Sequence, residues 1–135
     1  MKFFNSSTSS LWNSKVNFVD ENNVLVGYDY EDQCCEDFGW FLSHKINDSC
    51  RTIDEQIATD DSLVNTLLEG WEFDPTFFEQ KSPDEGSYDE QNLAIFRMIK
   101  KEHVMYLHLY NVHNGYYSHG FDFSKDGEII HTGCL

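Results

Sequence analysis

Histidine and cysteine are the residues of this 135-residue chain whose spacing is most informative about metal and catalytic chemistry. A zinc site needs ligands at short fixed spacing, such as C-x-x-C or H-x-x-x-H, and no convincing set of this kind occurs. His108 and His119 would need a third ligand from elsewhere in the chain. We therefore expect no metal and no cofactor, and we interpret these histidines as strand residues packed among aromatic rings.

Nucleophilic catalysis by a cysteine and a histidine stays open, because residues far apart in sequence can meet in the fold. The chain has no nucleophile elbow, no phosphate-binding glycine loop and no paired-carboxylate signature. The pattern therefore favours a binding protein over an enzyme, and we assign no catalytic residue.

The stretch His103–Ser124 carries the strongest local signal in the chain. Two alternating, aromatic-rich runs flank Asn114-Gly115, the dipeptide that best fits a type I′ turn. This pattern predicts a β-hairpin in which Tyr110 pairs with His119. One face of that hairpin would carry Tyr106, His108, Tyr110, Val112, Tyr117, His119, Phe121 and Phe123.

The function of this aromatic face has two possible interpretations. Tyrosine and histidine rings can stack on a planar ligand and hydrogen-bond its polar edges, which makes Tyr110, Tyr117 and His119 candidate ligand-binding residues. Alternatively, the face is the core of a sandwich or of a sheet covered by a helix. Phe121 and Phe123 fit the core reading better, because Tyr110, Tyr117 and His119 lie nearer the turn.

Charge limits the class of partner. The chain holds 24 acidic residues against nine lysines and arginines, so its formal net charge is −15 and its pI is near 4.5. Affinity for phosphate backbones needs clustered Lys and Arg, so we expect no direct binding to nucleic acid. Such acidity favours solubility, and it also suits a protein that occupies a basic site on a macromolecular partner.

The sequence also bears on location. No window of about 18 apolar residues suggests a membrane span, and the first residues lack the apolar core of a secretory signal. The four cysteines, Cys34, Cys35, Cys50 and Cys134, show no spacing typical of a disulfide framework. We therefore expect a cytoplasmic protein without contact to a membrane.

The fold expected is α+β, formed by a single domain over residues 1–135. Its main part is an antiparallel sheet of about six to eight strands. The segment Thr52–Glu69 has a capping-box pattern and helical spacing of apolar residues, which predicts one or two short helices before Gly70. We assign no element to Met1–Asn13 and a loop to Lys81–Glu90. The remaining expected strands are Lys15–Val19, Val24–Tyr30, Cys34–Ser43, Trp71–Glu79, Asn92–Lys100 and Glu128–Thr132.

Two patches resemble a group of small bacterial and phage proteins, most of them uncharacterised. The segment Asp32-Gln33-Cys34-Cys35-Glu36 is similar to the D-C-C-E segment of that group, with Gln33 where the pattern has Asp. Asn114-Gly115-Tyr116-Tyr117-Ser118 matches its N-G-Y-Y-S hairpin near the carboxyl end. The resemblance implies that the two patches lie close together in the fold.

The same group is similar to Thoeris anti-defence phage proteins, which sequester a cyclic ADP-ribose-type signal without cleaving it. This implies a nucleotide-like ligand whose phosphates are held by basic residues. His108 stands where a basic residue would be wanted, and Arg97 is our candidate cation, with Arg51 and Lys100 as alternatives. Shared fold is therefore a better expectation than shared ligand.

Two hypotheses for function result. The first is a non-enzymatic binding protein, a counter-defence sponge for a small nucleotide-like signal that uses Tyr110, Tyr117, His119, Arg97 and His108. The second is an acidic inhibitor or immunity-type protein that blocks a basic surface of a protein partner. A cysteine and histidine metal or hydrolase site is a weaker third idea, and the oligomeric state stays open.

Overall fold

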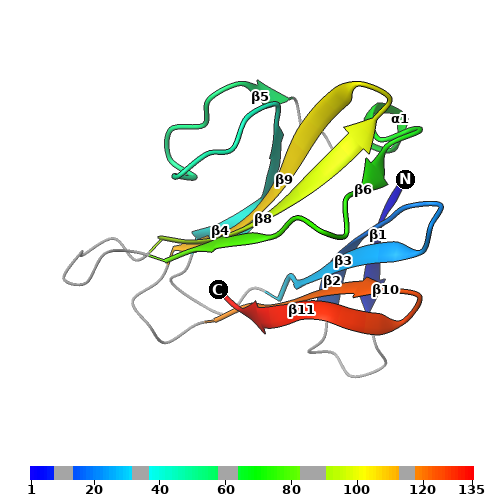
Figure 1. Cartoon of the computed structure of the whole chain (residues 1–135). Coiled ribbons are helices and arrows are strands. Elements are labelled where there is room, and N and C mark those ends of the chain that lie inside the picture. Colours follow the sequence, from blue (N-terminus) through cyan, green and yellow to red (C-terminus); the bar gives the residue numbers. More distant parts are fainter. Residues whose placement is uncertain (8–13, 32–36, 58–63, 83–90, 113–117) are drawn as a thin grey trace.

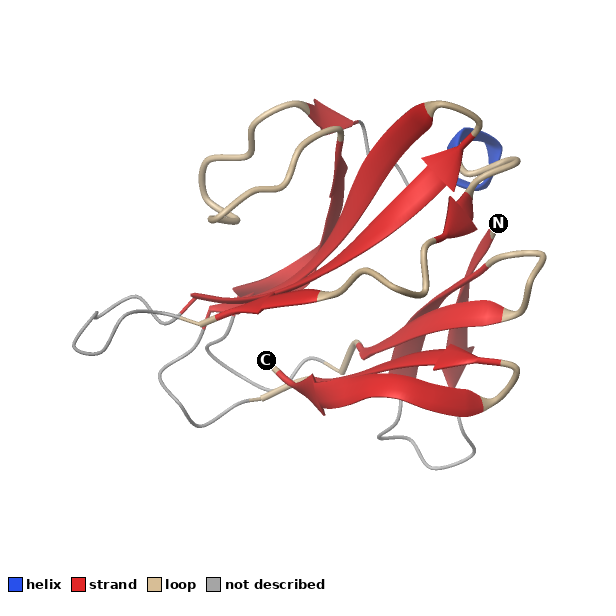
Figure 2. Ribbon diagram, in the orientation of Figure 1, coloured by secondary structure: helices blue, strands red, loops and turns tan. Residues whose placement is uncertain are grey.

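The computed structural model describes residues 1–7, 14–31, 37–57, 64–82, 91–112 and 118–135. Two antiparallel sheets pack face to face as two layers (Figure 1). Sheet A has the strand order β1-β2-β3-β10-β11, and sheet B has the order β5-β4-β9-β8-β6 with β7 also paired to β8. In the described residues strands dominate, and one four-residue helix lies beside the edge of β1 (Figure 2).

The elements have the following bounds: β1 Lys2–Ser7, β2 Ser14–Val19, β3 Val24–Asp29, β4 Asp37–Ser43, β5 Gln56–Ile57, α1 Val64–Leu67, β6 Glu72–Phe73, β7 Glu79–Lys81, β8 Gln91–Lys100, β9 His103–Val112, β10 Gly120–Lys125 and β11 Glu128–Cys134.

Tight turns join several neighbouring strands. Asn23, in the β2–β3 loop, has a φ of 59°, a conformation that Asn tolerates better than most residues. Asp126 and Gly127, with φ of 52° and 81°, connect β10 to β11, and this geometry is that of a type I′ turn. Lys101, with φ of 56°, lies in the turn between β8 and β9.

The core lies between the two sheets and is contributed by alternate residues of each strand. Sheet A supplies aromatic and β-branched side chains such as Phe18, Val26 and Phe123, all with 0 % exposure. Sheet B supplies Phe96 and Leu107 to the same cluster, also at 0 %. Phe96 meets Phe123 edge to face at 5.1 Å between ring centres, so aromatic pairs link the two layers directly.

The expected α+β class is wrong, because the fold is a pair of antiparallel sheets with very little helix in the described residues. Glu55, the last residue of the predicted capping box, has a φ of 55°, which is incompatible with a helical turn at that position. Ile57 belongs to β5, which pairs with β4. Among the described residues of this segment, Val64–Leu67 alone is helical, and Val64 and Leu68 are buried in the core.

The predicted hairpin over His103–Ser124 is also wrong. Its first run, β9, pairs with β4 and β8 in sheet B. Its second run, β10, pairs with β3 and β11 in sheet A. Tyr110 and His119 are therefore not cross-strand partners, and Asn114-Gly115 lies outside the described residues.

Several other strand predictions are confirmed, but Trp71–Glu79 is not one strand, because it holds only the two-residue strand β6 and the first residue of β7. The β2–β3 hairpin with its loop at residues 20–23, the long strand β8, and the β10–β11 turn at Lys125-Asp126-Gly127 all occur. The first strand, β1, was missed, because its Ser- and Asn-rich sequence shows little alternation. Within the described residues, no helix is long and apolar enough to cross a membrane.

Candidate functional site

Three of the predicted ligand-binding residues share one surface. Leu107 and Leu109 belong to the core between the sheets, so side-chain alternation places His108 and Tyr110 on the opposite side of sheet B. In the register of β8 and β9, Arg97 lies opposite Tyr106 and Ile95 opposite His108. We call this surface the outer face of sheet B.

His108 is packed into the outer face and is not open to solvent. Its exposure is 0 %, and its ring stacks on Phe41 at 4.3 Å between ring centres. Its Nε2 accepts a hydrogen bond from the backbone N–H of Asn47 at 3.0 Å, whereas Nδ1 has no partner within the described residues. Burial lowers the pKa of His108 to about 4, so the ring is neutral at pH 7 and its role here is to hold the segment that covers it.

That covering segment, residues 44–55, is organised by Asn47. The Asn47 amide donates to the Ser43 hydroxyl at 2.9 Å, and its oxygen accepts from the backbone N–H of Asp54 at 2.7 Å. Farther along, the Ser49 hydroxyl donates to the Gln91 side chain on β8 at 3.0 Å. The segment therefore crosses the outer face and buries its centre, including Leu93 and Ile95.

Tyr110 lies at the half-buried end of the same face. Its ring centre lies 6.1 Å from that of Phe41. Its hydroxyl packs closely over Gly39, the residue opposite on β4, where a side chain would collide with it. Burial raises the pKa of Tyr110 to about 12, with smaller contributions from Asp37, Tyr30 and Cys50. The hydroxyl is therefore protonated at pH 7 and can donate a hydrogen bond.

Arg97 lies at the other end of the outer face. Its Nε donates to the Asp74 carboxylate at 3.1 Å, and its guanidinium stands 4.7 Å from the ring centre of Phe77. The Thr76 hydroxyl and then Arg97 hold the pKa of Asp74 below its usual value. Arg97 is already neutralised within the chain, which weakens its case as a phosphate ligand.

His119 lies apart from these three residues. It is 1 % exposed, its ring stacks on Phe38 at 4.0 Å, and its Nδ1 lies 2.8 Å from the carbonyl oxygen of Asp29. Tyr28, 5.9 Å from the His119 ring, donates its hydroxyl to the carbonyl of Tyr110 and so links sheet A to sheet B. His119 is thus part of the packing between the sheets, and Tyr117 lies outside the described residues.

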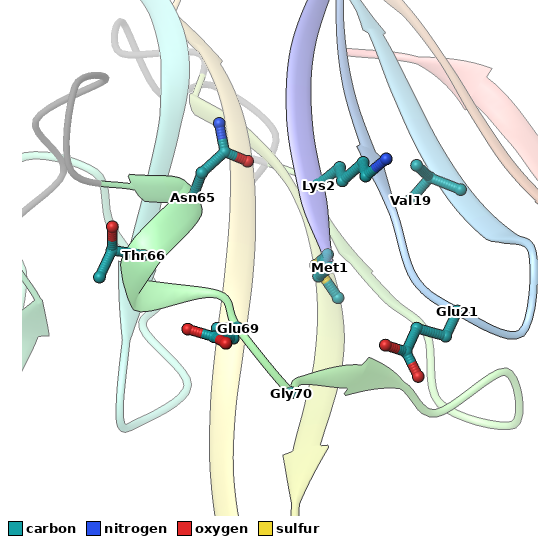
Figure 3. A pocket seen from close by; sticks show the side chains of 8 residues that line it. All are labelled: Met1, Lys2, Val19, Glu21, Asn65, Thr66, Glu69 and Gly70. Carbon is teal, nitrogen blue, oxygen red and sulfur yellow. The ribbon is translucent and has the colours of Figure 1, made fainter.

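Three hollows of the surface lie away from these residues. A shallow depression of about 350 Å³ lies between the α1 segment and the edge of sheet A. Figure 3 shows the side chains that line it. Another hollow, of about 480 Å³, adjoins it around Phe4, and a third lies at the β10–β11 turn. None of the predicted ligand-binding residues lines any of the three. The lining of the depression is Met1, Lys2, Val19, Glu21, Asn65, Thr66, Glu69 and Gly70.

Carboxylates gather where the turns of sheet A meet β6. The backbone N–H of Asp126 donates to the carbonyl of Asn23 at 3.0 Å, which joins the two turns of the sheet. The backbone N–H of Phe73 donates to Asp20 at 2.8 Å, which places β6 beside them. We call the resulting group the hairpin-end carboxylates: Glu21, Glu72, Asp126 and Glu128, all exposed and none in an ion pair within the described residues.

Sequence reasoning missed the polar side chains that fasten this fold. The Asp20 and Asn65 side chains bond backbone groups of another element, and the Asn47 side chain bonds the backbone of Lys45 and Asp54 within its own loop. Each of the three is a short polar residue in a loop or at a helix start. Short polar residues usually bond backbone groups close to them in the chain, so their sequence does not reveal a distant partner. The polar cluster at residues 20–23 predicted a turn, and nothing in the sequence predicted the contact of Asp20 with β6. Among the described residues, no group of three or more His, Cys, Asp or Glu could hold a metal ion.

Comparison with known proteins gives a family and no activity. No curated protein and no solved structure matches the chain. The model of a family described as a domain of unknown function, DUF7448, matches residues 7–123, which extend from the end of β1 into β10. The chain therefore belongs to the DUF7448 family.

Proposed function

We propose that this protein is a non-enzymatic binding domain that covers a basic surface of a macromolecular partner through its hairpin-end carboxylates. The observation that carries the proposal is the arrangement of these residues. Glu21 and Asp126 lie in two turns of sheet A, Glu72 in β6 and Glu128 in β11; all four are exposed and lack ion-pair partners in the part of the chain described. Carboxylates held this way by a rigid sandwich form an acidic patch at little entropic cost to binding.

The nine lysines and arginines of the chain cannot offset its 24 acidic residues. Lys15, Lys45, Lys81 and Arg97 each contact a carboxylate, and Lys100 donates to the carbonyl of Glu69. Lys2 lines a hollow with Glu21, and Lys125 lines another with Asp126 and Glu128. The segments outside the described residues hold eight acidic residues and no lysine or arginine: Asp32, Glu36, Asp60, Asp61, Asp84, Glu85, Asp89 and Glu90. The surplus of negative charge therefore belongs to the whole chain and favours rapid association with a basic partner.

Two variants of equal charge test where that partner binds. The first carries Glu21→Gln, Glu72→Gln, Asp126→Asn and Glu128→Gln. The second, the matched control, carries Glu31→Gln, Asp37→Asn, Glu55→Gln and Glu102→Gln, four carboxylates outside the patch that likewise form no ion pair within the described residues. Each variant changes the formal net charge from −15 to −11.

The immobilised protein is used to capture partners from a cell extract at about 0.05 M salt, and the dissociation constant of the captured protein is then measured. We expect a basic partner that is released near 0.5 M salt and binds the first variant at least about tenfold more weakly than the control. Equal weakening in both variants would show unspecific attraction to charge, and no retained protein would remove the proposal.

A nucleotide-like ligand is a second candidate, supported by one aromatic group. Tyr30 is 37 % exposed and meets Phe38 edge to face at 5.0 Å, and Tyr110 is half-buried nearby. Such rings can stack on a base, which would fit the implied resemblance to anti-defence sponges. Against it, Arg97 is neutralised by Asp74.

A thermal-shift screen against cyclic ADP-ribose isomers tests this second candidate. Binding raises stability by about 2.7 kcal/mol at a hundredfold excess over the dissociation constant, which is visible as several degrees. The shift should disappear in Tyr30→Ala and persist in Phe4→Ala, which removes a similarly exposed ring from sheet A. A flat screen, or equal loss in both variants, would leave the acidic binding domain as the sole proposal.

A further inference from the structure

We propose that a proton releases the covering segment, residues 44–55: when His108 takes up a proton, the segment detaches from the outer face of sheet B while the two sheets stay packed. The exposure of that face is then set by pH. The proposal goes beyond the acidic surface described above and does not depend on it.

The covering segment buries little of itself. Asn47 is the one buried residue in this segment, which is described throughout. Its apolar residues, all partly buried, are Ile46, Cys50 and Ile53. The sheet beneath is apolar at its centre, where Leu93 and Ile95 are fully buried. Because the segment has few buried apolar groups, its position depends on polar contacts, and such segments open before the rest of a fold.

Polar contacts fasten the middle of the segment to two neighbouring strands. On β9, Nε2 of His108 accepts the hydrogen bond from the backbone N–H of Asn47 at 3.0 Å. On β8, the side-chain oxygen of Gln91 accepts from the Ser49 hydroxyl at 3.0 Å and from the N–H of Cys50 at 3.1 Å. An amide oxygen does not titrate, so the contact that a proton can change is the one to His108.

His108 accepts this bond in one protonation state only. A nitrogen that accepts an N–H carries no proton, so the neutral ring has its single proton on Nδ1. A second proton must go to Nε2, where the new N–H points at the N–H of Asn47. Two donors then face each other, and a flip of the ring does not help, because both nitrogens of the charged ring are donors.

The ring is held more firmly than the segment above it. It stacks on Phe41, with 4.3 Å between ring centres and 11° between ring planes. Its strand, β9, lies between β4 and β8 and pairs with both. The segment, in contrast, rejoins the sheet only through the short strand β5. Movement of the segment therefore relieves the conflict between the two donors.

The neighbours of His108 include few groups that titrate in the same range. The strand residues against the ring on β4 and β8 are Phe41 and Ile95, which do not titrate. The titratable or charged groups around it are Tyr106 and Tyr110 on β9, Arg97 on β8, Lys81 on β7 and Asp48 in the covering segment. The other charged residues of the segment are exposed.

The ion pair between Asp48 and Lys81 persists while His108 titrates. The hydrogen bond and charge of Lys81 hold the pKa of Asp48 below its usual value, so this carboxylate stays largely charged as the pH falls to 4. Lys81 also disfavours the charged form of His108, in the same direction as burial. Release between pH 6.5 and 4 is therefore assigned to His108.

The direction of the pH effect follows from the two states of the segment. Burial lowers the pKa of His108 to about 4 when the segment is closed, whereas a solvated ring titrates near 6.5. The closed state binds fewer protons, so it is favoured above pH 6.5 and becomes less favoured as the pH falls to 4. Over most of this range the ratio of open to closed molecules rises about tenfold per pH unit.

Hydrogen exchange at pH 6.5, 5.5 and 4.5 measures the opening. Protection factors, which remove the pH dependence of the intrinsic exchange rate, are compared for the amides of Asn47 and of Leu107, a core residue of β9. We expect Asn47 to be at least about a hundredfold less protected than Leu107 at each pH. Its protection should fall about fortyfold between pH 6.5 and 4.5.

Two variants separate the proton from the other contacts. His108→Gln keeps an acceptor for the N–H of Asn47 and cannot take up a proton, so the protection of Asn47 should not change with pH. Gln91→Ala, the control, removes the acceptor of Ser49 and Cys50. It should lower the protection of Asn47 at every pH and leave its fall with pH unchanged.

Three results would overturn the proposal: equal protection of Asn47 and Leu107, a protection of Asn47 that is constant with pH, or the wild-type fall in folded His108→Gln. Loss of the fall in Gln91→Ala would assign it to another contact and would also count against His108. Should His108→Gln fail to fold, the nitrogen chemical shifts of the wild-type ring decide, because Nε2 must be the unprotonated nitrogen at pH 7.

Discussion

A single side chain, Asn65, completes the edge of sheet A next to α1. Its amide binds both the N–H and the C=O of Phe3, the same two contacts that a neighbouring strand would make. Phe3 itself is 7 % exposed and packs against Phe18 and Trp40, with ring centres 5.0 and 5.2 Å away. The amide therefore fixes the position of an aromatic residue of the core.

We predict that Asn65→Ala lowers the free energy of unfolding by about 2 kcal/mol, because it removes two hydrogen bonds and leaves the N–H of Phe3 without a partner. Urea denaturation measures the change. Thr66→Ala, at the adjacent exposed position of α1, is the control and should change stability by less than about 0.5 kcal/mol. Equal effects of the two substitutions would contradict a specific role for Asn65.

His108 should make stability depend on pH. Its folded-state pKa of about 4 lies below the ordinary 6.5, so the unfolded chain binds a proton more readily than the folded one. The free energy of unfolding therefore falls as the pH drops from 6.5 to 4, by about 3 kcal/mol for this group when the whole interval is crossed. Above pH 6.5 the contribution of His108 is constant.

The measurement compares urea denaturation at pH 7, 5.5 and 4.5 for the wild type and His108→Gln. The variant cannot take up the proton, and its amide can still accept the bond from Asn47, so its loss of stability on acidification should be smaller. His103→Gln, at an exposed position of β9, should behave as the wild type does. A wild-type slope in His108→Gln would assign the acid sensitivity to the carboxylates instead.

At the scale of elements, Asp20 joins a hairpin of sheet A to a strand of sheet B. One of its carboxylate oxygens accepts from the N–H groups of Asn22 and Val24 at 3.0 and 2.9 Å, and the other from Phe73 on β6 at 2.8 Å. The side chain is 6 % exposed. A buried carboxylate with three backbone donors is strongly held, and its removal leaves all three donors without an acceptor.

We expect Asp20→Ala to lower the free energy of unfolding by about 3 kcal/mol, with β6 opening before the rest of the sheet. Hydrogen exchange at the Phe73 amide would report that opening, and thermal denaturation the global loss. Glu21→Ala, next in the chain and exposed, serves as the control. If Phe73 stays protected in Asp20→Ala, then Asp20 does not fasten β6.

Elements that depend on near neighbours were predictable from sequence, and those that depend on distant ones were not. The β2–β3 and β10–β11 turns follow from polar residues and Gly127, whose local preferences decide the outcome. The partners of β9 are β4 and β8, and nothing within the run itself distinguishes them from β10. The helical spacing of Val64, Leu67 and Leu68 does mark a helix, but α1 is only four residues long. No helix begins at the predicted capping box, because Glu55 has a positive φ.

The candidate site was predictable to a similar extent. The alternation of side chains along a strand predicted that His108 and Tyr110 lie on the same face of the sheet, and they do. This prediction needs only the geometry of a strand. Residues 44–55 cover that face, and the contacts of Asn47 with His108 and of Ser49 with Gln91 hold them there. The sequence does not show these contacts between distant residues, so the covering of the face was not predictable. The ligand-binding roles of Tyr110, Tyr117, His119, Arg97 and His108 stay predictions.

At the scale of the whole molecule, the net charge of −15 opposes the compact state through self-repulsion. Added salt screens that repulsion, so we predict that the melting temperature rises by several degrees between about 0.05 and 0.5 M sodium chloride. Differential scanning calorimetry measures it. Either of the variants with net charge −11 should show a smaller rise, and a fall with salt would mean that the ion pairs matter more than the repulsion.

The strand order of sheet A has a consequence for protein synthesis. Its central strand, β3, pairs with β10, and all strands of sheet B lie between these two strands along the chain. While the ribosome is still making residues 120–134, β3 has a bare edge and the cavity for Phe121 and Phe123 is empty. All strands of sheet B are therefore synthesised before sheet A can be completed. During this interval apolar surface of sheet A is exposed, and we expect the nascent chain to need a chaperone most at that stage.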